Sequence, residues 1–254
     1  MRTIETGAFI AKEVQLPESF TIGANAVVLA FNQSDEMMPT IIAEGVYIGA
    51  NATIMEGVTL GLKSKVMPGS VVTKSIPPLS IVAGNPAKII GYVNTNDQTL
   101  IPPGDTHKTP STLYQSTVKG VNLHRFKAIA DLRGSLTVGE FERDIPFPSK
   151  RYFLVFDVPT AETRGEHAHY ACHQFLIAVK GSVTVIADDG HAREEFTLNA
   201  PNVGLYLPPM TWGIQYNYSE DAVLLVFASH YYEANDYIRD YQDFIQAAKQ
   251  QPQA

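Results

Sequence analysis

Two histidines in the second half of the chain have a spacing that could support chemistry. They lie in the segment Arg164-Gly165-Glu166-His167-Ala168-His169. In a β-strand His167 and His169 point to the same face, because successive side chains alternate between faces. Two imidazoles on one inward face could bind a metal ion, or they could move protons, since an unperturbed imidazole titrates at about pH 6.5. The alternative is a pair of hydrogen-bonded core histidines.

The residues that follow the pair argue against a metal ion. The spacing matches a first cupin motif, which runs HxH, three or four residues, Glu, six residues and Gly, but Gln174 occupies the glutamate position. The segment where a second motif should supply a histidine, Gly204–Gly213, contains none. Two imidazoles alone would hold a divalent ion weakly. We expect His173 to face away from the pair rather than to supply a third ligand. We expect no metal, and proton transfer as the role of the pair.

The elements that position these histidines are predicted to be short antiparallel strands. Apolar or alternating runs are separated by turn residues, of which Asp188-Asp189-Gly190 predicts a hairpin. The runs are Tyr152–Phe156, Gln174–Val179, Val183–Ile186, Gly204–Leu207 and Ala222–Ala228. The tail, Asn235–Ala248, spaces its apolar residues like one face of a helix. This pattern predicts a jelly-roll β-barrel of cupin type with a C-terminal helix.

The first half has a different pattern, a period of six residues that suits neither an α-helix nor an isolated strand. A period of six is typical of a solenoid whose short strands each point one aliphatic residue into a narrow core. The ten aliphatic residues are Ile10, Leu16, Ile22, Val28, Ile42, Ile48, Ile54, Leu60, Val66 and Val72. The ladder predicts a β-helix of about three coils, with a loop inserted between Val28 and Ile42. The fold class is therefore all-β in both halves.

Composition separates the two halves. All seven histidines lie at or beyond His107, and twenty of the twenty-five aromatic residues follow residue 95. A polar, proline-bearing stretch from Asn94 to Ser116 has no periodicity and is typical of a linker. We therefore predict a β-helix over residues 1–94, a linker over 95–118 and a barrel over 119–254.

The overall composition excludes several classes of function. The chain has 254 residues, 45% hydrophobic and 18% charged, and a net charge of −7, so it has no general attraction to nucleic acid or anionic lipid. Cys172 is the single cysteine, which excludes an internal disulfide and any multi-cysteine metal cluster. No signal peptide and no run of about 18 apolar residues is present. The expected location is the cytoplasm, with neither nucleic acid nor membrane as a partner.

The first half resembles the left-handed β-helix acyltransferases built from hexapeptide repeats, most clearly in Pro77–Lys88. The resemblance implies acetyl-CoA as cosubstrate, a trimer as the working unit and a coenzyme A site near this segment, for which the candidates are Gly84, Asn85 and Lys88. The inserted loop would supply the acceptor site, with the candidates Asn32, Asp35 and Glu36. The half lacks the histidine that many members use as a base. The alternatives are that these loop residues are merely solvated and that the β-helix serves only to trimerise the chain.

The second half resembles the dTDP-4-keto-6-deoxyglucose 3,4-ketoisomerases (WxcM/FdtA-like). The matching blocks include RGSL at 133–136, IPF at 145–147, KR at 150–151, RGEHAH at 164–169 and DYIRDY at 236–241. Together with the β-helix, the chain resembles the bifunctional ketoisomerase/N-acetyltransferases that make acetamido-dideoxyhexoses for bacterial surface polysaccharides.

The resemblance implies roles for individual residues. His167 and His169 would carry the proton transfers between carbons 3 and 4 of the ketosugar, although which is base and which is acid stays open. Arg151 is the candidate donor to the oxyanion that develops, and no cofactor is needed. The candidates for substrate binding are Arg164 (diphosphate), Gln174, and Tyr206 or Tyr216 (thymine stacking), and either tyrosine could instead belong to the core.

Other functions and assemblies remain as alternatives. Gly213 follows Trp212 where the family would have a larger polar residue, so the product configuration is open. A 3,5-epimerase built on the same RGxH frame would leave the ketone at carbon 4, and a non-catalytic scaffold would bind the nucleotide sugar without turnover. A homo-oligomer is expected, trimeric through the β-helix, and a hexamer if the barrels also pair.

Overall fold

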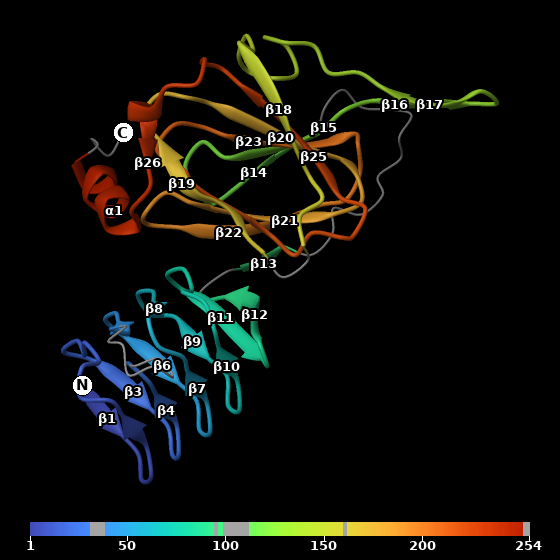
Figure 1. The fold of residues 1–254 in the computed structure, drawn as a ribbon. Helices are drawn as coiled ribbons and strands as arrows, with labels where there is room; N and C mark the ends of the chain where they lie inside the picture. The colour runs from blue at the N-terminus through green and yellow to red at the C-terminus, as the bar shows by residue number, and fades with distance from the viewer. Residues whose placement is uncertain (31–38, 94–95, 99–111, 160–161, 251–254) are drawn as a thin grey trace. The chain divides into compact units, whose positions relative to one another are not determined.

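The computed structural model describes residues 1–30, 39–93, 96–98, 112–159 and 162–250. The chain divides into two compact units, Met1–Asn94 and Thr95–Ala254 (Figure 1), and each is described by itself. Among the described residues, no helix is long and apolar enough to cross a membrane.

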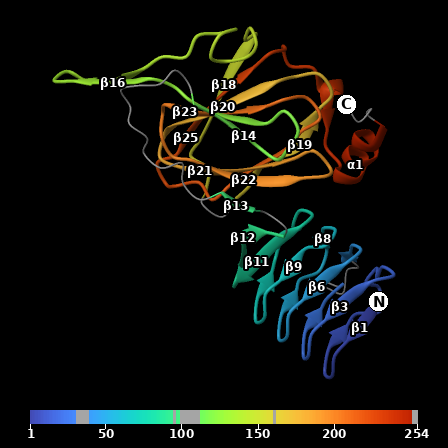
Figure 2. The ribbon, with the colours of Figure 1, turned by 180° about the vertical axis from the view of Figure 1, so that it is seen from behind.

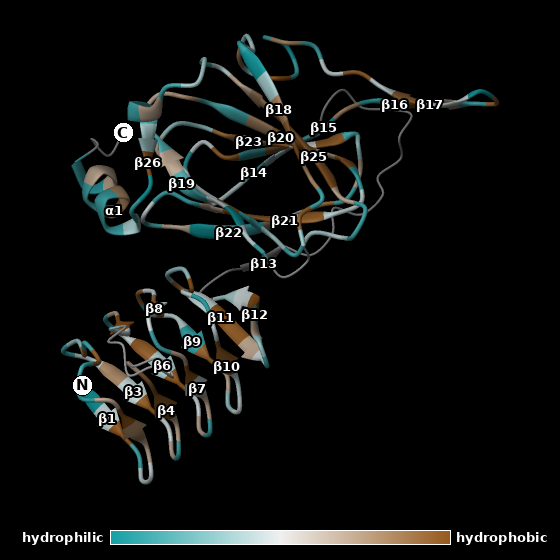
Figure 3. Cartoon of the chain, in the orientation of Figure 1, coloured by the Kyte–Doolittle hydropathy of each residue, from teal (hydrophilic) through white to brown (hydrophobic). Residues whose placement is uncertain are grey.

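The first unit is a parallel β-solenoid, in agreement with the six-residue period. Its strands are β1 (Arg2–Ile4), β2 (Phe9–Ile10), β3 (Phe20–Ile22), β4 (Val27–Val28), β5 (Ile41–Ile42), β6 (Val46–Ile48), β7 (Thr53–Ile54), β8 (Thr59–Leu60), β9 (Lys65–Val66), β10 (Val71–Val72), β11 (Ser80–Gly84) and β12 (Ala87–Tyr92). They stack in three faces, β1-β3-β6-β9-β11, β2-β4-β7-β10, and a third that holds β5 and β8. The hydrophobic colour in Figure 3 follows these short strands, and the turns between them are paler.

The solenoid has about four coils rather than the three expected from the ladder. The sequence pattern was counted from Ile10, the first of the ten aliphatic residues. In the structure β1 pairs with β3, with Ile4 opposite Ile22, so a complete coil precedes β3. Leu16 belongs to this first coil and is 37% exposed, because no further coil covers it, whereas Ile22 and Ile48 are fully buried. Aliphatic residues stacked coil upon coil thus form the core of this unit.

The second unit is a barrel of two six-stranded sheets, which confirms the cupin-type fold. One sheet has the order β13-β22-β21-β24-β19-β26 and the other β14-β15-β23-β20-β25-β18. The strands are β13 (Asn96–Gln98), β14 (Thr112–Gln115), β15 (Asn122–Arg125), β18 (Arg151–Phe156), β19 (Arg164–His169), β20 (Gln174–Lys180), β21 (Val183–Asp188), β22 (Arg193–Leu198), β23 (Val203–Leu207), β24 (Trp212–Tyr216), β25 (Val223–Ala228) and β26 (Tyr237–Ile238).

The predicted hairpin at 188–190 is confirmed, because it joins β21 to β22 in antiparallel register. Apolar side chains from the two sheets meet between them and form the barrel core. A separate hairpin of β16 (Ala128–Asp131) and β17 (Gly134–Thr137) extends away from the barrel in both views (Figures 1 and 2). The predicted linker contains β13 and β14 at its two ends, and each pairs with a strand of the barrel.

The predicted helix at 235–248 begins later than expected. Residues Ala234–Asp236 form a 3-10 turn, Tyr237–Ile238 form β26, and the helix α1 covers Tyr241–Gln250. Asp240 caps α1, since its carboxylate accepts hydrogen bonds from the backbone N–H groups of Gln242 and Asp243. The apolar period was therefore right for Tyr241 and Phe244, which are buried, and wrong for Tyr237 and Ile238, which belong to a strand.

Helix α1 is held to the barrel by a buried polar cluster. Tyr241 donates a hydrogen bond to Asp188 at 2.7 Å, and Arg193 forms an ion pair with the same carboxylate. Trp212 packs edge-on against Tyr241, with the ring centroids 5.2 Å apart. These contacts fix the start of α1, and with it the residues of β26 just upstream.

Candidate active site

Strand β19 carries both histidines and has an irregular register. Its pairing with β24 shifts between Gly165 and His167, and Gly165 and Glu166 both have positive φ. A Cβ at Gly165 would lie 2.6 Å from the carbonyl oxygen of Gly213, so a glycine is required there. After this bulge His167 pairs with Gly213 and His169 with Tyr237.

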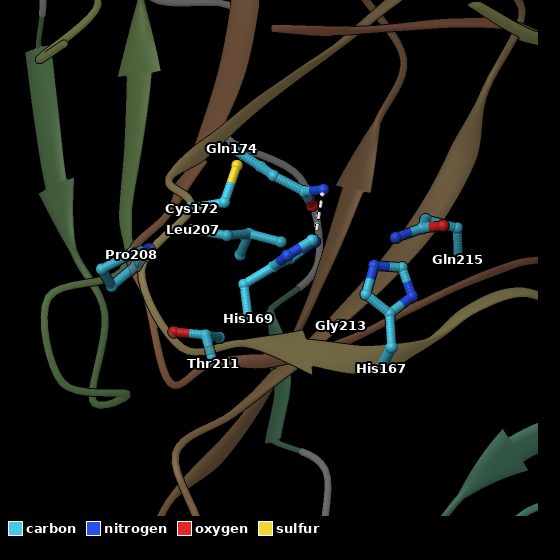
Figure 4. A pocket seen from close by; sticks show the side chains of 9 residues that line it. All are labelled: His167, His169, Cys172, Gln174, Leu207, Pro208, Thr211, Gly213 and Gln215. Atoms are coloured by element: carbon cyan, nitrogen blue, oxygen red, sulfur yellow. Dashed lines mark hydrogen bonds between the residues drawn. The ribbon is translucent and has the colours of Figure 1, made fainter. Parts of the chain in front are cut away.

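The two imidazoles lie beside one another in a pocket, as the alternation predicts. Their ring centroids are 4.9 Å apart and the planes are nearly perpendicular. In Figure 4 the ring of His169 points toward Gln174, and His167 lies beside Gln215. The other lining residues are Cys172, Leu207, Pro208, Thr211 and Gly213.

His167 is set up to accept a proton. Its Nδ1 lies 2.9 Å from the carbonyl oxygen of Gly165, which can only accept, so Nδ1 carries the hydrogen and Nε2 keeps its lone pair. Burial lowers the pKa of His167, the carbonyl of Gly165 opposes this, and the positive charge of Arg239 lowers it further. The ring is therefore a neutral base at pH 7.

His169 is held from both sides. Its Nδ1 donates to Asp236 Oδ2 at 2.9 Å, and its Nε2 lies 3.1 Å from the amide nitrogen of Gln174, which donates to it. Burial and the neighbouring His167 lower the pKa of His169 to about 4, against the opposing effect of Asp236. The contact with Asp236 is thus a hydrogen bond between a neutral imidazole and a carboxylate at pH 7, and it becomes an ion pair when the ring takes a proton.

Tyr237 connects the histidines to Arg151. Its ring centroid lies 5.0 Å from that of His167 and 4.3 Å from that of His169. Its hydroxyl accepts a hydrogen bond of 3.3 Å from Nη2 of Arg151, at the start of β18. The Nε atom of Arg151 is buried without a hydrogen-bond partner in the described structure, so this guanidinium keeps donor capacity.

Sequence reasoning missed Asp236 and Tyr237 as site residues. Both were assigned to the predicted helix, whereas the pairing of β26 with β19 brings Tyr237 to the histidines, together with Asp236, which precedes β26 and lies 67 positions beyond His169. One local signal could have corrected this assignment. An aspartate such as Asp240, followed three residues later by the acidic Asp243, is typical of a helix N-cap, and it would have placed the start of the helix after Ile238.

Of the other predicted substrate-binding residues, Arg164 lies beside the histidine pocket and the two tyrosines do not. Arg164 is exposed at the start of β19 and pairs with Gln215, which lines the pocket. Tyr206 lies outside the pocket, stacked on His173, whose Nδ1 is 2.6 Å from its hydroxyl. Tyr216 is buried and, because strand residues alternate, faces away from Gly213 and Gln215 of the same strand.

The predicted residues of the first unit are placed only in part. Gly84 ends β11, Asn85 follows it with a cis bond to Pro86, and Lys88 lies in β12; all three are exposed. The acceptor-site candidates Asn32, Asp35 and Glu36 lie outside the described residues.

Within the described residues, one set of side chains has metal-ligand chemistry. Atoms of His169, Cys172 and Asp236 lie within 4.8 Å of one another. Two of them, His169 Nδ1 and Asp236 Oδ2, are already hydrogen-bonded to each other, so the group is explained as a histidine–carboxylate pair beside a buried thiol. His173 lies between β19 and β20 and contacts the hydroxyl of Tyr206 instead. That the chemistry needs no metal stays a prediction.

Comparisons with known proteins match each unit separately. Residues 119–249 match the FdtA family model (WxcM-like, C-terminal), and residues 39–74 match the hexapeptide repeat of succinyl-transferase. A TDP-4-oxo-6-deoxy-alpha-D-glucose-3,4-oxoisomerase of Aneurinibacillus thermoaerophilus is 46% identical over 119 residues, which are 47% of this chain and 86% of that protein.

A solved structure supports the same relationship. A mutant of the 3,4-ketoisomerase QdtA from Thermoanaerobacterium thermosaccharolyticum, in complex with TDP-4-keto-6-deoxyglucose, superposes with a TM-score of 0.52 and 40% identity over 54% of this chain and 99% of that one.

For the solenoid, a 2,3,4,5-tetrahydropyridine-2,6-dicarboxylate N-acetyltransferase of Clostridium perfringens is 48% identical over 82 residues. The match covers 32% of this chain and only 35% of the length of that relative. The FdtA match, in contrast, takes in more than half of the chain and includes every residue of the histidine site, Arg151 of β18 among them. The chain belongs to the FdtA (WxcM-like, C-terminal) family.

Proposed function

We propose that the barrel unit catalyses 3,4-ketoisomerisation of dTDP-4-keto-6-deoxyglucose to the dTDP-3-keto-6-deoxyhexose. The observation that carries the proposal is the pair of neutral imidazoles in one pocket, with Asp236 behind one of them and Arg151 linked through Tyr237. The family membership and the printed activities of the relatives support it.

The isomerisation requires two proton movements, and the site offers one imidazole for each. A proton is removed from C3 and, after the imidazole that took it has exchanged with solvent, a proton is delivered to C4, while a hydroxyl proton passes from O3 to O4. The ketone at C4 thereby becomes a hydroxyl and the hydroxyl at C3 becomes a ketone, with an enediolate in between. No electron acceptor is needed, since the oxidation at C3 balances the reduction at C4.

We assign the carbon proton to His169 and the oxygen proton to His167. When Nε2 of His169 takes the C3 proton, the ring becomes cationic, and the carboxylate of Asp236 at 2.9 Å stabilises that charge. The hydrogen on Nδ1 of His167 is held by the carbonyl of Gly165, so its Nε2 is free to take a hydroxyl proton. Arg151 is the donor for the enediolate oxygen. Gln174 must release Nε2 of His169 when substrate binds.

Product analysis tests this function against its rival. Incubation with dTDP-4-keto-6-deoxyglucose, followed by proton NMR, should reveal a ketone at C3 and a new hydroxyl-bearing carbon at C4. A product that keeps its ketone at C4 and is inverted at C3 or C5 would identify a 3,5-epimerase instead. A spectrum that stays unchanged while dTDP binds would identify a binding protein.

For the solenoid we propose a second activity, transfer of an acetyl group from acetyl-CoA to the amine of a dTDP-3-amino-3,6-dideoxyhexose. The parallel solenoid and its likeness to N-acetyltransferases support it. The exposed Lys88, with Gly84 and Asn85 at the β11–β12 turn, is the candidate for coenzyme A binding. An aminotransferase acting between the two steps would link them in the synthesis of a surface-polysaccharide sugar.

Release of free coenzyme A upon mixing acetyl-CoA with the amino sugar tests the second activity. The acetylated sugar should appear in equal amount, and Lys88→Ala should raise the KM for acetyl-CoA. A solenoid that forms trimers but releases no coenzyme A would have an assembly role only.

A further inference from the structure

One polar side chain of the histidine pocket has no part in the proposed proton transfers. Gln215 of β24 lines the pocket and is 8% exposed. Two neighbouring polar side chains are already bonded to protein atoms, since His167 contacts the carbonyl of Gly165. The other, Gln174, donates to His169. Among the residues drawn in Figure 4, no hydrogen bond reaches the carboxamide of Gln215. A buried amide without a partner is costly, so this one points to a ligand.

Two glycines make room for the carboxamide of Gln215. Its nitrogen and oxygen lie 2.9 and 3.0 Å from the position that a Cβ at Gly165 would take, and the nitrogen lies 3.7 Å from that of a Cβ at Gly213. A side chain at position 165 would therefore displace the amide. Gly213 pairs with His167, so Gln215, two residues further along the same face of β24, is the diagonal neighbour of that imidazole. Figure 4 shows its carboxamide turned toward His167.

An amide in this position suits a ketone with a hydroxyl on the adjacent carbon. A carboxamide is neutral and presents N–H donors beside a carbonyl acceptor. A 4-keto sugar has a hydroxyl donor at O3 and an acceptor at O4. In the proposed mechanism His167 moves a proton between these two oxygens, so they lie at its Nε2. The amide of Gln215, beside the same ring, is placed to bind them.

We propose that Gln215 binds the oxygens on C3 and C4 of the ketosugar and so fixes the face of the sugar ring that His169 meets. The inference rests on the proposed function, since it concerns the same sugar in the same pocket. A sugar held by both oxygens cannot turn over between the two carbon steps. His169 therefore delivers a proton to C4 on the face from which it removed the proton of C3.

Delivery on one face determines the configuration of the product. The hydrogen on C3 of the gluco sugar is axial, because its hydroxyl is equatorial. A proton that reaches C4 from the same face leaves the new hydroxyl on the opposite face, where it is axial. The expected product is therefore dTDP-3-keto-6-deoxygalactose. Delivery to the other face would give the gluco isomer.

Proton NMR of the product tests this role, because the coupling between H4 and H5 is small when the C4 hydroxyl is axial and large when it is equatorial. The wild type should give the small coupling. Gln215→Met keeps the length of the side chain and removes the amide. It should raise the KM about 5- to 50-fold and yield both configurations. Gln215→Glu should lower kcat more strongly, because its charge repels the enediolate.

Binding without turnover separates contact with the sugar from an effect on the fold. In a His169→Asn background, Gln215→Met should weaken dTDP-4-keto-6-deoxyglucose about 5- to 50-fold in titration calorimetry. Affinity for dTDP, which lacks the ketosugar, should not change. Gln242→Met is the matched control, since this glutamine is exposed on α1, and it should alter neither affinity. Equal melting temperatures would show that each variant is folded.

The possible failures are distinguishable. A KM and a product configuration in Gln215→Met equal to those of the wild type would overturn the role of Gln215. A gluco product from the wild type, or an equal loss of affinity for dTDP and for the ketosugar in Gln215→Met, would also overturn it. All three outcomes leave the isomerase proposal standing. If the wild type forms no 3-keto product, the proposed function itself is wrong.

Discussion

The Nδ1 atom of His169 lies 2.9 Å from a carboxylate oxygen of Asp236, a residue that follows it by 67 positions in the chain. The same carboxylate accepts hydrogen bonds from the backbone N–H groups of Ala171 and Cys172. Asp236 is thus fixed by the backbone next to the ring it supports, and it can stabilise the imidazolium without moving.

Replacing Asp236 with asparagine should lower kcat about 10- to 100-fold with a smaller effect on KM, because the cationic form of His169 loses its counter-charge. The measurement is steady-state kinetics on the ketosugar. Asp240→Asn is the matched control, since this aspartate caps α1 and faces no reacting group. It should keep kcat, and a similar loss of kcat in both variants would mean that Asp236 acts only on folding.

Activity should persist below the pH at which free histidine protonates. The proposed mechanism starts with both imidazoles neutral, burial lowers the pKa of His167, and the pKa of His169 is about 4. In a plot of kcat/KM against pH, the midpoint of the acidic limb should therefore lie below pH 6.5. A limb with its midpoint at or above pH 6.5 would contradict neutral, buried bases.

The same lowered pKa values predict how stability depends on pH. A histidine whose folded pKa lies below its unfolded value of about 6.5 binds fewer protons in the native state. The free energy of unfolding should then be unaffected by these groups above pH 6.5 and fall as the pH drops toward about 4. Urea titrations across this window should show the fall, and His169→Gln should reduce its slope.

Tyr237→Phe should lower kcat about three- to tenfold, because it removes the 3.3 Å hydrogen bond that holds Arg151 while keeping the ring against both imidazoles. Tyr237→Ala should cost more, since it also removes the ring. Tyr231→Phe serves as the control in the same kinetic assay. Equal kcat in Tyr237→Phe and the wild type would show that the hydroxyl does not position Arg151.

Tyr241→Phe should destabilise the barrel unit by about 1–3 kcal/mol, because the buried carboxylate of Asp188 loses one of its donors. Chemical denaturation followed by circular dichroism measures this. Because α1 follows β26 directly, the loss should be accompanied by weaker activity at temperatures near the melting transition. An unchanged unfolding midpoint would mean that the Asp188–Arg193 pair is sufficient by itself.

Much of the fold could be predicted from the sequence because it depends on local periodicity. The period of six gives one inward residue per solenoid face, and the alternation in β19 places His167 and His169 together. Gln174 was expected at the site from motif spacing, and it contacts His169. The extra coil was missed because exposed residues such as Ile4 mark it poorly.

The rest of the site depends on tertiary pairing that local patterns do not encode. Tyr237 and Ile238 have helical spacing relative to Tyr241, yet they form the strand β26, which pairs with β19. Tyr216 was chosen for its chemistry, but its strand position turns it away from the pocket. The need for glycine at the bulge in β19 could not be predicted either, because it arises from the close approach of Gly213, which belongs to a strand distant in the sequence.

The central claim is that His169 moves a proton between carbons 3 and 4 of a ketosugar. Its most direct test is proton NMR of the wild-type chain and His169→Asn with dTDP-4-keto-6-deoxyglucose in deuterated water, after chelation of metals. The account predicts a 3-keto product with deuterium at carbon 4 for the wild type, and a loss of at least about 100-fold in that exchange for His169→Asn. Deuterium incorporation at the wild-type rate in His169→Asn, or none in the wild type, would contradict it.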